Sequence, residues 1–301
     1  MDRDTDIMLS FENQFYWLQE HGIPIQESEK ERCMFFLKNN NYFYKLISFS
    51  KNFNGVIKNF DMLCDISTLD MELRYVLLKL CLDIEHFTKT YILRITTNDP
   101  EEDGYRIVQN VFANDDNPDE LKKQIFSSVS YYKDTEFIVR PPYDIFFDTP
   151  SIWIVLELAS FGKLRGFLKY LSSKRPKNSD LRSLEHSFKY INKLRNSCAH
   201  NRNLINNDVR IEASSTVLPG YILKTLGSDG FDSNESRRPL IRSIALSLRI
   251  HRRLCSPVCH AHRINDLEEW LDRTDRHKDF YVDNEFQNTF NYIRKCVDIY
   301  K

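Results

Sequence analysis

The chain has 301 residues, a formal net charge of −1, 42% hydrophobic residues and 28% charged residues, which is typical of a globular protein with a sizeable core. No run of eighteen apolar residues occurs, and the opening stretch MDRDTDIMLS lacks an apolar segment, so we expect neither a membrane span nor a signal peptide. Seven scattered cysteines without a CxxC pair indicate reduced thiols and a cytoplasmic location.

The first elements are expected to be helices, because glycine and proline are scarce and phenylalanine and tyrosine are plentiful. Ser10 is a good N-cap and Gly22 a good stop for the first of them. Three short helices are predicted over residues 9–22, 27–40 and 41–50. They would form an N-terminal helical extension, residues 1–60.

A long helix follows over residues 69–96, where apolar residues recur with the helical period. The acidic stretch 98–120 is expected to be a loop with one short helix, and the proline-containing stretch 137–150 an extended connector. A helix kinked near Gly162 is predicted over 151–172, and another over 181–204. Residues 61–210 would form the helical core.

Residues 211–301 are expected to add a helical C-terminal elaboration. Residues 207–236 are rich in Ser, Gly and Asp and have no clear pattern. Three helices are predicted after them, over 239–255, 264–273 and 284–300. The fold class expected for the whole chain is therefore all-α.

The helix at 181–204 contains the stretch KLRNSCAHNRN, residues 193–203. On a helical wheel, Arg195 and Arg202 fall inside the apolar stripe, while Asn196 and His200 lie together at its border. A guanidinium on an apolar face needs a partner, and Glu85 of the long helix is our candidate for Arg195. The stripe itself consists of Leu184, Phe188, Ile191, Leu194 and Cys198.

Two interpretations of this stretch remain open on the residues alone. It is either a site that holds a phosphate and moves a proton, or an ion pair that keeps two helices in register. The Arg-x4-His spacing cannot decide between them, because arginines are common in the chain. When four to six intervening residues are allowed, a second match, Arg253 to His260, appears, and it is set aside because Pro257 interrupts a continuous helix there.

The surrounding sequence resembles the Abi-like (abortive infection) family of the HEPN superfamily over residues 9–210. LRNSCAHNRNLIN is similar to its LRN-x-x-AH signature. Three further stretches agree in order, with an asparagine–aromatic element, an IE-bearing long helix and a P-x-W-x-x-LE-x-x-SFG-x-L segment. They are FENQFYWLQEHGIPIQESEKERCMFFLKNNNYFYKL, LRYVLLKLCLDIEHFTKTYI and PSIWIVLELASFGKL.

This resemblance implies a dimeric helical bundle and a metal-independent endoribonuclease that acts as a toxin in phage defence. It implies Arg195, Asn196 and His200 as catalytic residues, and Lys193, Arg202 and Asn203 as RNA contacts. Such chemistry suits an imidazole, which can serve as base or acid near neutral pH, and arginine, which binds two phosphate oxygens at once. No metal or cofactor is expected, and a small non-coding RNA is an expected partner.

Other functional classes stay open. Some HEPN proteins bind RNA without cutting it, and a purely structural helical adaptor would use the same polar residues as core ion pairs. Residues 237–263 carry seven arginines and no acidic residue, so this segment either tracks RNA phosphates or forms a solvated helix face. The stretch CSPVCHAH could bind zinc, but the close spacing of its four donors favours a loop. The donors are Cys255, Cys259, His260 and His262.

Overall fold

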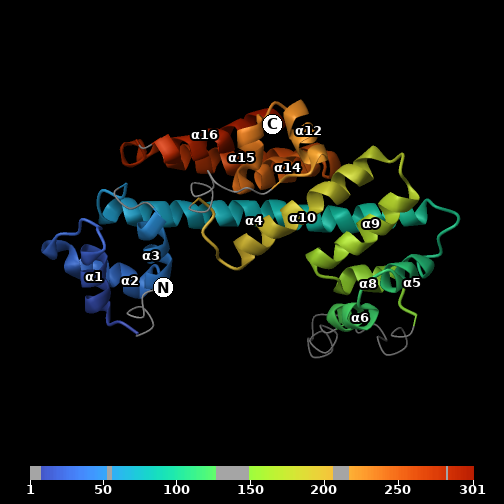
Figure 1. Ribbon diagram of the computed structural model, residues 1–301, viewed down its shortest axis with the longest axis horizontal. Coiled ribbons are helices and arrows are strands. Elements are labelled where there is room, and N and C mark those ends of the chain that lie inside the picture. Colours follow the sequence, from blue (N-terminus) through green and yellow to red (C-terminus); the bar gives the residue numbers. More distant parts are fainter. Residues whose placement is uncertain (1–7, 53–55, 127–148, 206–216, 283) are drawn as a thin grey trace. The chain divides into compact units, whose positions relative to one another are not determined.

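The computed structural model describes residues 8–52, 56–126, 149–205, 217–282 and 284–301, which form helices and turns without any strand (Figure 1). The all-α prediction is confirmed. No helix among these residues is long and apolar enough to cross a membrane. The chain folds as two compact units of non-consecutive segments, and the predicted division into three consecutive segments stays a prediction.

Unit 1 comprises residues 1–78, 196–245 and 261–301. Short turns of 3-10 helix, Glu27–Glu29 and Lys278–Phe280, precede helices α2 and α16 of this unit. Two of its helices, α14 and α15, also extend into unit 2, as does the long helix α4. The helices of unit 1 are α1 (Phe11–Glu20), α2 (Lys30–Asn39), α3 (Phe43–Asn52), α4 (Phe60–Thr97), α12 (Gly220–Ser228), α13 (Ser233–Arg237), α14 (Pro239–Leu254), α15 (Pro257–Asp275) and α16 (Asn284–Tyr300).

In unit 1, helix α15 contacts the first part of α4 through buried polar groups. Asp65 is buried and accepts hydrogen bonds from Arg273 and Tyr281, both at 2.5 Å. One turn further along α4, the Trp270 indole donates to the Leu69 carbonyl at 2.9 Å. Buried polar groups are costly without partners, so these bonds fix the register between the two helices.

Unit 2 comprises residues 79–195 and 246–260. Helix α5 lies beside α8 and α9, and Gly166 of α9 permits this close approach, since a Cβ there would meet Val111 at 3.2 Å (Figure 1). The rings of Phe161 and Phe188 pack against each other in the core at a tilt of 47°, with centroids 4.5 Å apart. Its remaining helical elements are α5 (Arg106–Ala113), α6 (Pro118–Phe126), α8 (Ile152–Leu158), a 3-10 turn (Phe161–Lys163), α9 (Leu164–Lys174) and α10 (Ser179–Ala199). The last residues of α10, from Asn196 on, belong to unit 1.

Several element boundaries differ from the sequence prediction. The stretch 98–120 contains α5 and the start of α6 rather than one short helix, and the Asp103 and Asn117 side chains accept backbone N–H groups in the first turns of these helices. The helix predicted over 151–172 is broken at Ala159–Ser160, not kinked at Gly162.

Two further boundaries are corrected in the C-terminal third of the chain. Helices α12 and α13 occupy part of the stretch that showed no pattern, and α15 begins at Pro257 instead of residue 264. By contrast, α16 spans Asn284–Tyr300 as predicted, and Ser10 caps α1 as predicted. Most of the predicted extended connector lies outside the described residues.

Candidate functional site

Helix α10 carries the first half of the motif. Its predicted apolar stripe is confirmed, since all five stripe residues from Leu184 to Cys198 are buried. Arg195 and Asn196 are half-buried, and Lys193 is exposed. Arg195 therefore lies at the edge of the apolar face, with its Nε shielded from solvent.

The helix ends earlier than predicted, at Ala199 rather than near Leu204. Asn201 adopts a left-handed conformation with φ of 56°. Its N–H bonds to the Cys198 carbonyl at 3.2 Å, and the Arg202 N–H bonds to the Ser197 carbonyl at 2.9 Å. This pair of bonds is a Schellman motif, and asparagine tolerates the left-handed position better than most residues.

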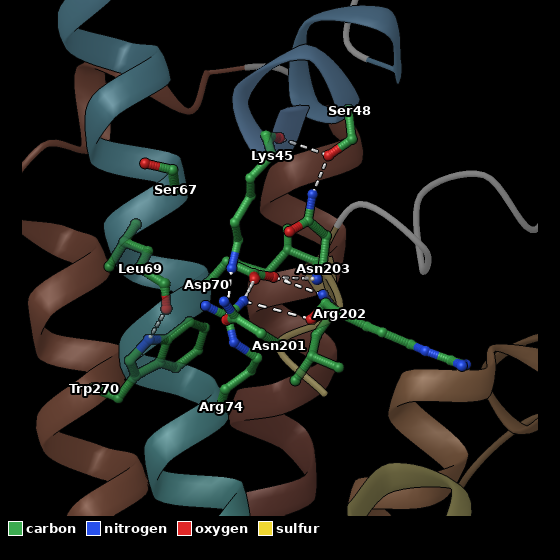
Figure 2. Close-up of polar contacts among 12 residues, drawn as sticks. Lys45, Ser48, Ser67, Leu69, Asp70, Arg74, Asn201, Arg202, Asn203 and Trp270 are labelled. Carbon is green, nitrogen blue, oxygen red and sulfur yellow. Dashed lines mark hydrogen bonds and ion pairs between the residues drawn. The ribbon is translucent and has the colours of Figure 1, made fainter. Parts of the chain in front are cut away.

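The early end of α10 changes where the second half of the motif lies. His200 and Arg202 are both exposed, so the prediction that Arg202 falls inside the apolar stripe is wrong. Figure 2 shows the Arg202 side chain pointing away from Lys45, Asp70 and Arg74, which form a polar cluster beside it. His200 is the C-cap residue of α10, and its N–H bonds to the Asn196 carbonyl at 2.9 Å.

Side chains of unit 1 hold this turn in place (Figure 2). The Lys45 amine of α3 donates to the Asn201 Oδ1 at 3.0 Å, and the Asn203 amide donates to the Ser48 hydroxyl. Arg74 of α4 donates to the Arg202 carbonyl at 3.4 Å. The backbone that carries His200 and Arg202 is thus bound to two other helices.

Asp70 of α4 is the centre of the polar cluster and is fully buried. Its Oδ1 accepts the backbone N–H of Leu204 at 2.7 Å and of Ile205 at 2.9 Å. Its other oxygen is paired with the buried Arg74 one turn away. Burial raises the pKa of the Asp70 carboxyl, while Arg74 and the two amides act in the opposite direction.

Lys45 is 4% exposed and lies close to the Arg74 guanidinium. Burial, and then repulsion by Arg74, lower the pKa of Lys45 to about 8. The amine can donate to Asn201 in either protonation state, because a neutral amine keeps two N–H groups. Lys45 therefore positions the turn over a wide pH range.

Sequence reasoning missed Lys45, Asp70 and Arg74. The sequence does contain a signal for this ion pair. Asp70 and Arg74 are four residues apart on the buried face of α4, which also includes the buried residues Leu69, Leu73 and Leu77. An opposite-charge pair at this spacing inside an apolar face indicates a buried ion pair.

The predicted partner of Arg195, Glu85, has an ion-pair partner on its own helix. Glu85 is 17% exposed at its side chain and forms an ion pair with Lys89, one turn along α4, at 3.5 Å. The pairing of Glu85 with Arg195 stays a prediction.

One group of potential metal donors occurs among the described residues, and it lies in unit 2. It consists of His251, Cys255 and Cys259. The turn that carries His200 has no such group among its described contacts, since Asp70 is fully engaged by Arg74 and backbone amides.

Comparisons with known proteins give one result. A family model described as Abi-like protein matches residues 32–206, which is more than half of the chain. No curated protein and no solved structure matches. The matched residues include α3, α4, α10 and the turn with His200.

Proposed function

Since the chain belongs to the Abi-like family, we propose that it is a metal-independent endoribonuclease of the HEPN type that acts in abortive infection. Membership of this family links the chain to defence against phage. The ribonuclease activity is our inference from the residues at the end of α10. We expect the enzyme to act on RNA in the cytoplasm and to stop growth of the infected cell.

The observation that carries the proposal is the exposure of His200 and Arg202 on a turn that buried polar side chains of α3 and α4 hold in place. The polar cluster of Lys45, Asp70 and Arg74 holds the turn by its backbone and by Asn201. It leaves the His200 imidazole and the Arg202 guanidinium directed to solvent. Catalytic groups act best when rigid elements position them, so such a frame suits a reactive site.

The proposed reaction needs three tasks, and the motif supplies a residue for each. An imidazole at His200 removes the proton of the 2′-hydroxyl or protonates the leaving 5′-oxygen. Arg195 and Arg202 bind the phosphate and stabilise the negative charge of its transition state. Asn196 orients the imidazole or the phosphate. Lys193 is exposed and available to the RNA backbone, whereas the Asn203 amide is already bonded to Ser48 and is better suited to holding the turn.

No divalent metal takes part in this proposal. Mg²⁺ sites in nucleases use carboxylates, and the carboxylate of this cluster, Asp70, is buried and bonded to Arg74 and two amides. Without a metal-bound water, the nucleophile nearest the phosphate is the 2′-hydroxyl of the substrate itself.

A homodimer would complete the site. One chain offers one motif histidine, whereas this cleavage uses both a base and an acid. Two copies related by a two-fold axis would place two histidines and four arginines around one RNA. A small non-coding RNA, as inhibitor or partner, remains a prediction of the family resemblance.

The test is incubation of the pure protein with total RNA in EDTA, followed by mapping of the new ends. The proposal expects cleavage by the native protein and none by His200→Ala of equal helicity. Lys224→Ala, a change in unit 1 outside the motif and the polar cluster, is the matched control and should cut like the native protein. RNA binding without cutting would show a non-catalytic RNA-binding module, and neither binding nor cutting would favour a structural adaptor.

A further inference from the structure

Four side chains of unit 2 converge where α14 gives way to α15. Asp83 comes from α4, His251 from the last turn of α14, Cys255 from the connection, and Cys259 from the first turn of α15. Donor atoms of the histidine and the two cysteines all lie within 4.8 Å of one another. His251 is fully buried and Cys255 nearly so.

Three of the separations among these donors are close to those expected around a single tetrahedral ion. The His251 Nε2 lies 3.2 Å from the Asp83 Oδ2 and 3.9 Å from the Cys259 Sγ, and the Asp83 Oδ2 lies 3.6 Å from the Cys259 Sγ. Ordinary zinc bond lengths at tetrahedral angles separate such atoms by about 3.4 to 3.6 Å. Asp83 lies outside the group whose donor atoms are all within 4.8 Å of one another, so a shift of its side chain toward Cys255 would seat an ion among the four donors.

Local sequence explains how residues so close in the chain can surround an ion. Ser256 caps α15, with its hydroxyl accepting the Cys259 N–H at 3.2 Å, and Pro257 occupies the first helical position. The chain therefore turns between Cys255 and Cys259 and brings the two thiols together. His251 stands one helical turn before Cys255, with the Cys255 N–H bonded to the His251 carbonyl at 2.9 Å.

His260 supplies the orienting contact that zinc-bound histidines usually have. Its Nδ1 lies 3.0 Å from the His251 Nδ1, on the opposite side of the ring from Asp83 and Cys259. A hydrogen bond from the His251 Nδ1 to His260 would leave the His251 Nε2 lone pair directed at the other donors.

We propose that Asp83, His251, Cys255 and Cys259 bind one zinc ion. The two thiols release their protons to solvent on binding, and the histidine binds as the neutral ring. Two thiolates and an imidazole favour zinc over magnesium or calcium. Four protein ligands close the coordination shell, so the ion is structural and takes no part in RNA cleavage.

This site differs from the zinc set considered in the sequence. Of that set, Cys255 and Cys259 remain, His260 contacts His251, and His262 is exposed on α15. The two ligands that complete the shell, Asp83 and His251, lie outside the stretch CSPVCHAH. The proposed ion joins the α14–α15 junction to α4 within unit 2, and so ties the C-terminal segment to the family-matched region.

The experiment measures zinc in untagged protein that was offered zinc and then dialysed. We expect one zinc per chain in the native protein and none in the Cys255→Ser/Cys259→Ser variant. Cys64→Ser, at a half-buried thiol of unit 1, and His262→Ala are the matched controls and should keep full zinc. His200→Ala should also keep it, so this result does not depend on the ribonuclease proposal.

Cobalt substitution gives a second readout that needs no variant. With Co²⁺ in place of zinc, we expect intense visible bands of tetrahedral geometry and near-ultraviolet charge transfer from two thiolates. Native protein without stoichiometric zinc, a cobalt spectrum without thiolate bands, or equal zinc in the double serine variant would each overturn the proposal. The cobalt spectrum of the native protein tests the proposed site even if the double serine variant fails to fold.

Discussion

Asp70→Asn is the change that most directly tests the frame beneath the candidate site. The substitution keeps the shape of the side chain but removes its charge, so the Arg74 guanidinium, 2% exposed, remains buried without its ion-pair partner. The amide also offers only one oxygen where the carboxylate served two backbone N–H groups and Arg74. Breaking a buried pair from one side costs about 3–5 kcal/mol.

The assay is urea unfolding followed by far-ultraviolet circular dichroism. A cost of this size lowers the urea midpoint by about 1–2 M at an m value of about 3 kcal/mol/M. Asp275→Asn is the matched control, because it breaks an exposed ion pair with Arg294 at 3.3 Å and should cost less than about 1 kcal/mol. Asp70→Asn combined with Arg74→Met should cost less than the sum of the single changes, because no buried charge is left alone. Equal midpoints for Asp70→Asn and Asp275→Asn would refute this account of the cluster.

Three further predictions concern the turn and the motif. His200→Ala should abolish RNA cleavage and the toxicity of overexpression, and should change stability by less than about 0.5 kcal/mol because the side chain is exposed. Arg195→Ala should also abolish cleavage, at a larger cost in stability. Full toxicity of His200→Ala would show that the site is assigned wrongly. Asn201→Val should be about 1–2 kcal/mol less stable than Asn201→Gly in urea unfolding, because both lose the acceptor for Lys45 but only valine resists a φ of 56°; equal stabilities would contradict the left-handed cap. The pKa of Lys45 is lowered from 10.5 to about 8, so between these pH values the unfolded chain holds a proton that the native chain has lost, and the stability of the protein rises with pH through this window. Lys45→Met should lack this rise. Urea midpoints of the two proteins that run parallel at pH 7, 9 and 10 would contradict the prediction.

The sequence predicts the apolar architecture around the motif well. The helical spacing of the apolar residues alone identifies the buried face of α10, and the pattern of the last segment predicts α16 at its observed bounds. Both predictions work because an amphipathic helix repeats the same signal over several turns. Ser10 is likewise recognisable, because an N-cap acts within one turn of its own helix.

The polar cluster could not be predicted in the same way. Asp70 and the amides of Leu204 and Ile205 are more than 130 residues apart in sequence, and no local pattern joins them. The end of α10 was missed because asparagine is a weaker stop signal than glycine at the left-handed position. The start of α15 escapes prediction for a different reason: the Ser256–Pro257 pair is typical of a loop, but it is also a good helix start.

The chemistry of the cut ends tests the central claim most directly. A labelled RNA with one preferred cleavage site is incubated with the pure protein in EDTA, alongside the same RNA carrying a 2′-O-methyl group at the cut. Attack by the 2′-hydroxyl predicts a 2′,3′-cyclic phosphate on one product, a 5′-hydroxyl on the other, and no cleavage of the methylated RNA or of DNA. Activity that vanishes in EDTA and returns with Mg²⁺, or equal cutting of single-stranded DNA, would contradict the account.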